Sequence, residues 1–378
     1  MPAGGPGRVV LIEPVSSGWR MIRAGHELGL HVIVVTAGRG ERTVPAEHLR
    51  YAAEVHLVDT NDDDQVARLV CGLHDRRPLA AVLPGFEYYV PLAARLGSRL
   101  ALPSLDPEAA LDLRFKHRMR QALQRQGIPQ PRFHWVAAEE DVLPALDRTG
   151  LPCVVKPVDL AGSLMVRKVR EPAEALRAVR EIRRMRTADL ERPVSGDALI
   201  EEYVEGPEYS VEGFVEAGRM RVVCITSKFL GPEPYFVEAG HIVPGSITEP
   251  DRRIALAYVD RVAAALRLDR GPFHAELRCT LRGPMLMEIA ARLGGDRIPD
   301  LVQLALGVDL YRIALLSHLG LSAGDVGCPA EARWAGIRYF LPSEAHSFAD
   351  RGSYAIATGS SYAETLSRLD ELAAVAGR

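Results

Sequence analysis

Lysine is scarce in this sequence. Of its 46 basic residues, only Lys116, Lys156, Lys168 and Lys228 are lysines, and the other 42 are arginines. A coding bias toward arginine explains such a ratio, because either cation keeps a solvated surface charged. The two differ at a phosphate, where ammonium is a compact point charge and guanidinium is a rigid planar fork. A lysine kept against the bias therefore indicates a position that needs an ammonium group.

Other features that the sequence lacks exclude whole classes of protein. The net charge of −3 and the absence of a basic block argue against a nucleic-acid surface. No stretch of about 18 uncharged apolar residues is present, and the first apolar run is too short for a signal peptide, so we expect a cytoplasmic protein without a membrane segment. The five cysteines are odd in number and form no CxxC, which favours buried thiols over disulfides or a zinc site.

The first hundred residues alternate short apolar runs with amphipathic stretches. The expected strands lie at residues 9–14, 31–37, 54–59 and 79–84, and the expected helices at 18–28, 62–74 and 91–96. This alternation predicts a Rossmann-like parallel sheet with helices on both faces. No GxGxxG follows the first strand, so a dinucleotide is not favoured.

Ser17 and Glu87 follow strands of this predicted sheet. They lie at the carboxyl edge, where open parallel sheets bind ligands. Glu87 has two interpretations. It binds the amine of a substrate, or it is a solvated loop carboxylate, which is the commoner situation.

After residue 106 the pattern changes to helices and hairpins. Residues 151–169 are typical of a strand, a turn of small residues and a second strand. Because no helix follows the turn and no GxxxxGK[ST] is present, this segment is not a P-loop. It can be a flexible lid whose backbone N–H groups cover phosphates. Further helices are expected at 107–114, 116–126, 173–187, 250–267 and 362–375, and further strands at 197–204, 208–218, 219–229, 272–280, 284–295 and 334–342.

Two carboxylates stand out in the predicted hairpin around Arg282-Gly283. Pairing of its strands puts Glu276 and Glu288 side by side, which is unfavourable unless a cation neutralises them. Two carboxylates together with nucleotide phosphates suit Mg²⁺. The alternative is that one or both point to solvent. Glu288 lies in an otherwise apolar strand, and a buried unpaired charge is costly, which favours the metal site.

The order of these features resembles the ATP-grasp superfamily. The features are Lys116, Lys156 in VVKP, Ala161-Gly162-Ser163, LIEEYVEGPE, Lys228, Glu276 and MEIAARLGG. Within the superfamily, YFVEAGHIVP and EIAARLGG are most similar to the carboxylate–amine ligases that join amino acids, the L-amino acid ligase or dipeptide synthetase group. The resemblance extends from the first strand to about residue 320.

The resemblance implies an α/β protein in which two α+β lobes sandwich ATP. The implied parts are a Rossmann-like N-terminal domain (1–105), a small lobe with the lid (106–198), a large lobe with the metal site (199–320) and a C-terminal segment packed on the large lobe (321–378).

For the nucleotide, the resemblance implies contacts from lysines, lid and hinge. Lys116 and Lys156 would lie along the α and β phosphates, and Lys228 near the β and γ phosphates. The lid contributes Gly162 and Ser163. The hinge that reads adenine comprises Glu201, Glu202, Tyr203 and Val204, and Glu208 would take the ribose hydroxyls.

For the metal and the reacting groups, the resemblance implies that Glu276 and Glu288 hold Mg²⁺, two ions in all, with Mn²⁺ as an alternative. Arg292 would bind the substrate carboxylate or the transferring phosphoryl group. Many ATP-grasp enzymes have Asn two residues after the second Glu, where this chain has Ala290. The metal would then have one protein oxygen fewer.

Three further residues near the predicted site are candidates for contact with the substrates or phosphates. His241 contacts the substrate carboxylate or acyl phosphate, or is a structural loop histidine. His274 lies two residues before Glu276 on the same strand face, which directs it toward the phosphates. Asp296, after Gly295, shapes the substrate pocket or caps a helix. Lys168, just beyond the lid, is expected to be a solvated surface residue at which arginine is nearly silent.

The implied activity is an ATP-dependent ligation of a small acid and an amine or amino acid through an acyl phosphate, without nucleic-acid or membrane partners, in a chain that forms a homodimer or acts alone. Two alternatives stay open: a carboxylase that forms carboxyphosphate, and an ATP-binding module without catalysis.

Overall fold

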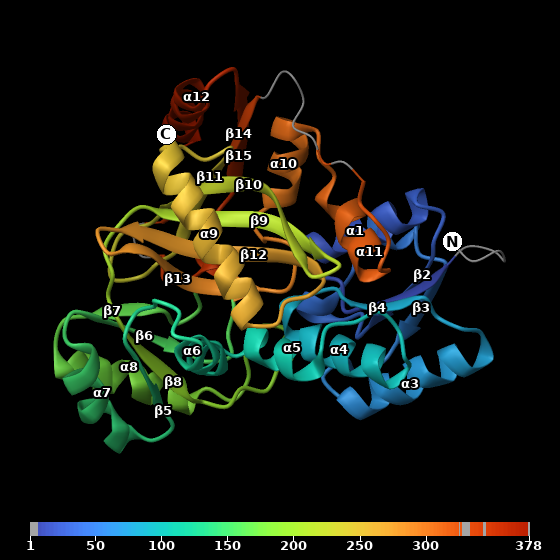
Figure 1. Ribbon diagram of the computed structural model, residues 1–378, viewed down its shortest axis with the longest axis horizontal. Helices are drawn as coiled ribbons and strands as arrows, with labels where there is room; N and C mark the ends of the chain where they lie inside the picture. Colours follow the sequence, from blue (N-terminus) through green and yellow to red (C-terminus); the bar gives the residue numbers. More distant parts are fainter. Residues whose placement is uncertain (1–6, 325, 327–332, 343–344, 377–378) are drawn as a thin grey trace.

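The N-terminal domain is built on a parallel sheet. A computed structural model describes residues 7–324, 326, 333–342 and 345–376, and the strands of this part of the chain form three sheets (Figure 1). The first sheet has the order β3-β2-β1-β4. Its strands are β1 (Arg8–Ile12), β2 (His31–Thr36), β3 (Glu54–Leu57) and β4 (Ala81–Pro84), and its helices are α1 (Ser17–Glu27), α2 (Ala46–Leu49), α3 (Asp63–Arg76) and α4 (Val90–Arg99). Strands β1 and β4 are wholly buried, as expected for a parallel sheet covered on both faces.

The small lobe is a four-stranded antiparallel sheet with the order β5-β8-β6-β7. Helices α7 (Val142–Thr149) and α8 (Pro172–Arg184) share a core with its strands. The strands are β5 (Phe133–Val136), β6 (Cys153–Pro157), β7 (Arg167–Val169) and β8 (Ala198–Glu202). Strands β6 and β7 form the predicted hairpin, with the small-residue turn between them.

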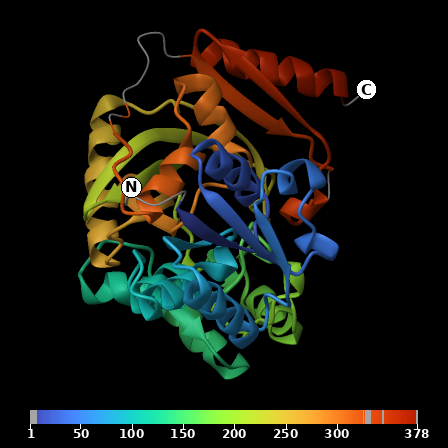
Figure 2. The same ribbon diagram turned by 90° about the vertical axis from the view of Figure 1, so that its right-hand side faces the viewer.

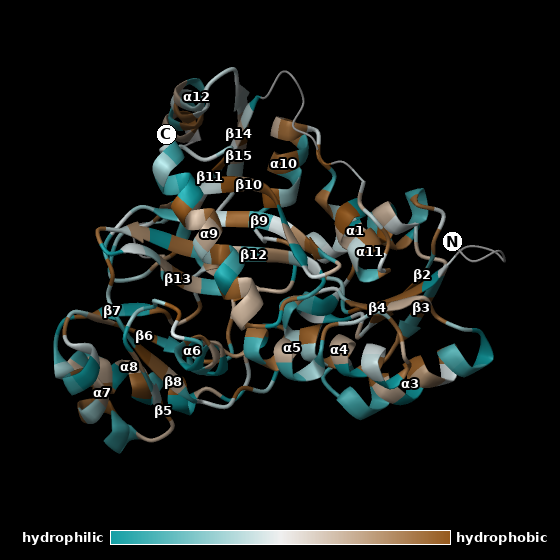
Figure 3. Cartoon of the chain, in the orientation of Figure 1, coloured by the Kyte–Doolittle hydropathy of each residue, from teal (hydrophilic) through white to brown (hydrophobic). Residues whose placement is uncertain are grey.

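The large lobe is a seven-stranded antiparallel sheet with the order β13-β12-β9-β10-β11-β14-β15. Its strands are β9 (Glu208–Glu216), β10 (Arg219–Leu230), β11 (Glu238–Val243), β12 (Gly271–Thr280), β13 (Gly283–Ala290), β14 (Trp334–Tyr339) and β15 (Tyr354–Gly359). Helix α9 (Glu249–Ala265) crosses the outer face of the sheet (Figure 1). Helix α12 (Tyr362–Ala376) packs on β14 and β15, at the end of the molecule away from the small lobe (Figure 2). Colouring by hydropathy shows that α3 carries both apolar and hydrophilic residues, as expected for a helix with one buried side (Figure 3).

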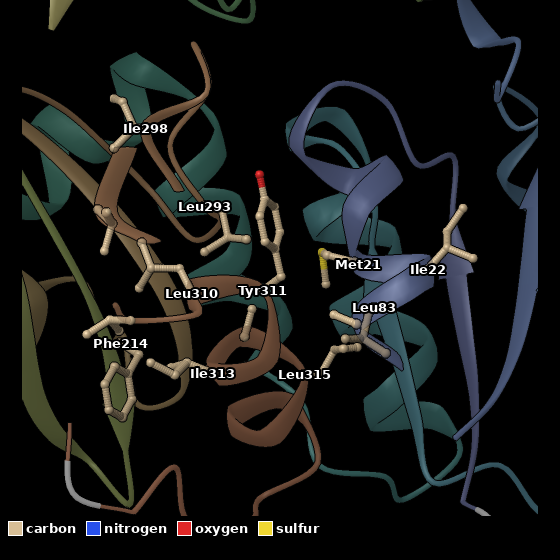
Figure 4. Packing of buried hydrophobic residues seen from close by; sticks show 14 of the residues in the cluster. Met21, Ile22, Leu83, Phe214, Leu293, Ile298, Leu310, Tyr311, Ile313 and Leu315 are labelled. Carbon is tan, nitrogen blue, oxygen red and sulfur yellow. The ribbon is translucent and has the colours of Figure 1, made fainter. Parts of the chain in front are cut away.

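Helices α10 (Ile298–Leu306) and α11 (Leu310–His318) join the large lobe to the N-terminal domain. Figure 4 shows Leu315 of α11 facing Leu83 of β4, with Met21 of α1 beside them. Most residues of both helices are buried, and the sequence pattern predicts neither of them. In the described part of the chain no single helix is long and apolar enough to cross a membrane, and only α10 and α11 together, bent by 111°, pass that test of length and composition.

The sequence pattern predicts most of the elements and misses a few short ones. The missed strands are β5, β11 and β15, which have four to six residues each. Helices α5 (Pro107–Arg114) and α6 (Lys116–Arg125) begin and end where expected, since Asp106 caps α5 and the Gly-Pro run follows α6.

Candidate active site

A cavity of about 420 Å³ lies where the three sheets approach one another. All the site residues expected from the sequence line it. They are Ser17, Glu87, Lys116, Lys156, Gly162, Ser163, Glu201, Glu202, Tyr203, Val204, Glu208, Lys228, His241, His274, Glu276, Glu288, Arg292, Gly295 and Asp296. Residues far apart in the sequence therefore meet in one place.

Glu276 and Glu288 face each other in the lining of the cavity. They are direct partners in the antiparallel register of β12 and β13, as the hairpin pattern predicts. The side chains are 20% and 25% exposed, so neither is a solvated surface group. Two accessible carboxylates on adjacent strands are a donor set that suits Mg²⁺ together with phosphate oxygens. Among the described residues, no group of three or more His, Cys, Asp or Glu side chains is arranged to hold a metal.

Both carboxylates are neutralised by cations of this chain. Lys228 Nζ lies 2.6 Å from Glu276 Oε1, and Lys116 Nζ lies 2.9 Å from Glu288 Oε1. His274 Nε2 lies 3.1 Å from Glu276 Oε1. Burial alone would raise the pKa of Glu276, but Lys228 and His274 outweigh it and hold that pKa well below its usual range.

Lys228 on β10 is surrounded by carboxylates. Its Nζ also lies 3.0 Å from Glu208 Oε1 and 3.8 Å from Glu238 Oε1. Burial opposes the charge, yet the carboxylates raise the pKa of Lys228 well above its usual range. The ammonium group stays charged beside the facing carboxylates, as phosphate binding requires.

Lys156 and Glu201 form a second buried pair beneath the hinge. Lys156 Nζ lies 2.7 Å from Glu201 Oε2, and Arg120 of α6 donates to Glu201 Oε1 at 2.6 Å. Burial raises the pKa of Glu201, but the two cations outweigh it and lower that pKa to about 2. Both oxygens of Glu201 thus have cationic partners within the protein, a pairing that its place in the hinge sequence does not reveal.

The lid is folded down over the cavity. Between β6 and β7 the chain turns at Gly162, whose φ is 65°. A Cβ at this position would lie 2.6 Å from a ring carbon of Phe348, so the turn packs against the short helix η5 (Phe348–Asp350) of the C-terminal segment. Ser163 Oγ donates to Glu238 Oε1 at 3.1 Å. The absence of a side chain at Gly162 is what permits this close packing.

Glu87 is not the solvated loop carboxylate that its type favoured. It is 2% exposed and accepts hydrogen bonds from Arg292 at 2.9 and 2.6 Å. Arg114 Nη1 lies 3.7 Å from its other oxygen. Burial raises the pKa of Glu87, but Arg292 and Arg114 outweigh it, so the pKa is lowered. The N-terminal domain therefore positions the arginine that follows β13.

Asp296 does not cap a helix. The residue that precedes α10 is Arg297, and no side chain caps that helix. Asp296 instead accepts from both terminal nitrogens of Arg351 at 2.7 Å, and His241 Nε2 lies 2.9 Å from it. His241 is 2% exposed, so it is a buried member of this cluster. His241 lies on β11 and not in the loop that one of its two interpretations assumes.

His274 points at Glu276 as its strand position predicts, and it has a second partner. Its Nδ1 lies 2.8 Å from Glu212 Oε1 of β9. Burial lowers the pKa of His274, but the two glutamates outweigh it and raise it to about 10. Glu212 was not recognised from the sequence, although a carboxylate inside an apolar strand is the same signal that singled out Glu288.

Lys168 is not a solvated surface residue. It is only 9% exposed, its Nζ lies 2.7 Å from Glu233 Oε1, and the same nitrogen lies 3.6 Å from the centre of the Tyr203 ring. The expectation failed because the loop that covers Lys168 comes from a distant part of the chain.

Comparison with known proteins identifies the class. Residues 149–300 match the ATP-grasp domain family, and residues 22–104 match the ATP-grasp N-terminal domain family. With the fold described above, the chain belongs to the ATP-grasp superfamily.

The relatives are similar over most of this chain. An uncharacterized protein, y4rH, of Sinorhizobium fredii (strain NBRC 101917 / NGR234) is 30% identical over 84% of this chain and 64% of its own length. The alanine–anticapsin ligase of Bacillus amyloliquefaciens is 25% identical over 67% of this chain and 57% of its own length. The chain thus spans less than two thirds of these curated relatives. The crystal structure of an L-amino acid ligase from Bacillus licheniformis, 21% identical, has a TM-score of 0.79 and covers 98% of both chains, which shows a shared fold.

Proposed function

We propose that this protein is an ATP-dependent carboxylate–amine ligase. It joins an amino acid or related acid to an amine or a second amino acid and releases ADP and phosphate. The observation that carries the proposal is the pair Glu276 and Glu288 on neighbouring strands of one cavity. Lys228 of β10 contacts Glu276, and Lys116 of α6 contacts Glu288. The similarity to alanine–anticapsin ligase supports the choice of substrates.

Glu276 and Glu288 are the residues that would hold Mg²⁺, two ions in this proposal, with Mn²⁺ as an alternative. Bound metal supplies neutralisation of the triphosphate charge. Lys116, Lys156 and Lys228 add positive charge along the phosphates, so that the carboxylate of the first substrate can approach the γ phosphorus. The acyl phosphate that results is attacked at its carbonyl by the amine of the second substrate, and phosphate leaves as the amide forms.

Arg292, oriented by Glu87, stabilises the charge on the transferring group in this proposal. His274 and His241 face the same cavity and provide further positive or hydrogen-bonding groups. The lid, packed on Phe348, excludes water that would hydrolyse the acyl phosphate. Tyr203, Val204 and the backbone of the hinge hold the adenine, with Glu202 beside them and Glu208 at the ribose.

A phosphate-release screen tests the proposal. Amino acids are supplied singly and in pairs with ATP and Mg²⁺, and products are detected by mass. Release that requires a pair and yields the amide supports the ligase. Release with bicarbonate and no amino acid points to a carboxylase, and nucleotide binding without release under any condition points to a module without catalysis.

Glu288→Gln tests the metal assignment, because it keeps the size of the side chain and removes one carboxylate charge. Turnover should be lost while circular dichroism shows an unchanged fold. Retained turnover would remove the metal assignment. Two finer parts of the proposal, a homodimer and a cytoplasmic location, are measured by light scattering and by cell fractionation.

A further inference from the structure

Lys168 is the lysine to which the proposed function assigns no phosphate contact. It lies on β7 just beyond the lid, and its side chain is buried without lining the cavity. Its ammonium group contacts Glu233 at 2.7 Å and the face of Tyr203 at 3.6 Å from the ring centre. A buried cation between a carboxylate and an aromatic ring has a defined position, because both contacts depend on where the charge sits.

The cluster around Lys168 ties together three segments of the chain. Tyr203 belongs to the hinge after β8, and Glu233 belongs to the loop between β10 and β11 of the large lobe. Tyr203 Oη donates to Glu233 Oε1 at 3.2 Å. The backbone N–H of Lys168 donates to Pro234 O at 2.8 Å. The end of the lid hairpin, the hinge and the large-lobe loop are therefore held at one point.

Two aromatic rings of this cluster line the cavity. The rings of Tyr203 and Phe236 lie 6.3 Å apart with an interplanar angle of 29°. Arg278 lies over both rings, 5.4 Å from each centre. Phe236 is carried by the loop that Lys168 holds through Pro234 and Glu233. A pair of nearly parallel aromatic faces in a cavity wall suits a flat heteroaromatic ring, which stacks favourably on such faces.

Charge compensation for Glu233 does not depend on Lys168 alone. Arg170 on the exposed side also pairs with Glu233. Arg170 is 57% exposed, whereas Lys168 is buried against the ring of Tyr203. The contribution specific to Lys168 is thus its position against the ring of Tyr203 rather than neutralisation of the Glu233 carboxylate.

We propose that Lys168 is a positioning residue for the base of the bound nucleotide. It fixes the ring of Tyr203 and, through Glu233 and Pro234, the loop that carries Phe236, so that the two rings form a base-binding wall. A guanidinium at this position is larger and planar and cannot keep both contacts of the compact ammonium. This inference rests on the proposed function, since it requires that the cavity bind a nucleotide.

The experiment compares a probe that has a base with a probe that lacks one. Binding of MgADP and of Mg²⁺–tripolyphosphate is measured by calorimetry for the wild-type protein, Lys168→Met and the control Arg170→Gln. Lys168→Met should bind MgADP about tenfold more weakly, because a desolvated cation–π contact and its ion pair are lost. Tripolyphosphate binding should stay within about twofold of wild type, and Arg170→Gln should weaken neither probe by more than about twofold.

Several outcomes would overturn the inference. Equal MgADP affinity in Lys168→Met and wild type would remove the positioning role, and equal losses for both probes would show a general effect on the fold or lid. If Lys168→Met does not fold, Lys168→Arg keeps the charge and should show the same selective loss for MgADP in smaller degree. A wild-type protein that binds no MgADP would overturn the proposed function as well, whereas binding that Lys168→Met retains overturns this inference alone.

Discussion

Glu87 of the N-terminal domain holds Arg292 of the large lobe, with Oε2 2.9 Å from Nε and 2.6 Å from Nη2. The two residues are 205 positions apart in the chain. Because Glu87 is buried, the arginine beside the facing carboxylates has its orientation set by a separate domain. The N-terminal domain is therefore part of the site, and substitutions that disturb this domain should affect catalysis.

Glu87→Gln should destabilise the protein by roughly 3 kcal/mol, because it removes a buried carboxylate charge that lies beside the buried Arg114 and the half-buried Arg292. Urea denaturation measures the change in unfolding free energy. The control is Glu27→Gln, which breaks the exposed pair of Arg23 and Glu27 on α1 and should change the unfolding free energy little. Equal effects of the two substitutions would show that the Glu87 pair does not contribute as its burial indicates.

Arginine at Lys116, Lys156 or Lys228 should lower kcat/KM for ATP by at least about tenfold, because a planar guanidinium cannot occupy the space of a compact ammonium. Lys228, enclosed by three carboxylates, should be the most sensitive. Initial-rate kinetics with varied ATP measure the effect. The exposed Arg125→Lys serves as the reverse exchange and should leave kcat/KM unchanged. Wild-type kinetics in all three variants would contradict the need for an ammonium group.

Leu190 of the small lobe is inserted into the core of the N-terminal domain. It is 3% exposed and packs in the cluster that includes Val35 and Leu73. Its N–H donates to Glu41 Oε2 at 2.6 Å, and the next residue, Glu191, pairs with Arg42. This contact holds the small lobe against the N-terminal domain.

Leu190→Ala should loosen that contact and cost roughly 2–5 kcal/mol, as for other buried leucines. Limited proteolysis should cut the lid segment faster, and KM for ATP should rise because the closed arrangement is less populated. Leu143→Ala, at a position 55% exposed on α7 of the same lobe, is the control and should behave as wild type. Unchanged proteolysis of Leu190→Ala would show that the lobes are held by other contacts.

His318 makes the stability depend on pH. Burial, aided by Arg270, lowers the pKa of His318 from 6.5 to about 4. As the pH falls below 6.5, the unfolded chain binds a proton that the folded protein does not, so the unfolding free energy decreases until about pH 4. The slope is at most about 1.4 kcal/mol per pH unit. His318→Gln should remove this part of the slope in urea titrations across that range, and an unchanged slope would contradict the prediction.

The local pattern of the sequence was sufficient for the Rossmann-like sheet, for the lid hairpin and for the strands that carry the facing carboxylates. Alternation at period two fixes which residues of a strand share a face, so His274 and Glu276 could be placed together before any tertiary contact was known. The family resemblance located the other residues of the cavity. The strands β5, β11 and β15 and the helices α10 and α11 were not predicted, since segments of four to nine residues carry only a weak periodic signal.

What the sequence determined by itself is therefore the facing carboxylates, the lysines and the strands that present them. Only the tertiary structure decided how these charges are paired. The sequence left the role of Glu87 open, and the contact with Arg292 in the folded protein decided it. The burial of Lys168 was not predicted, because Glu233, 65 residues away in the chain, folds over it. The physical reason is that the burial and pKa of an ionisable group depend on every segment packed around it, whereas sequence spacing describes only the segment to which it belongs.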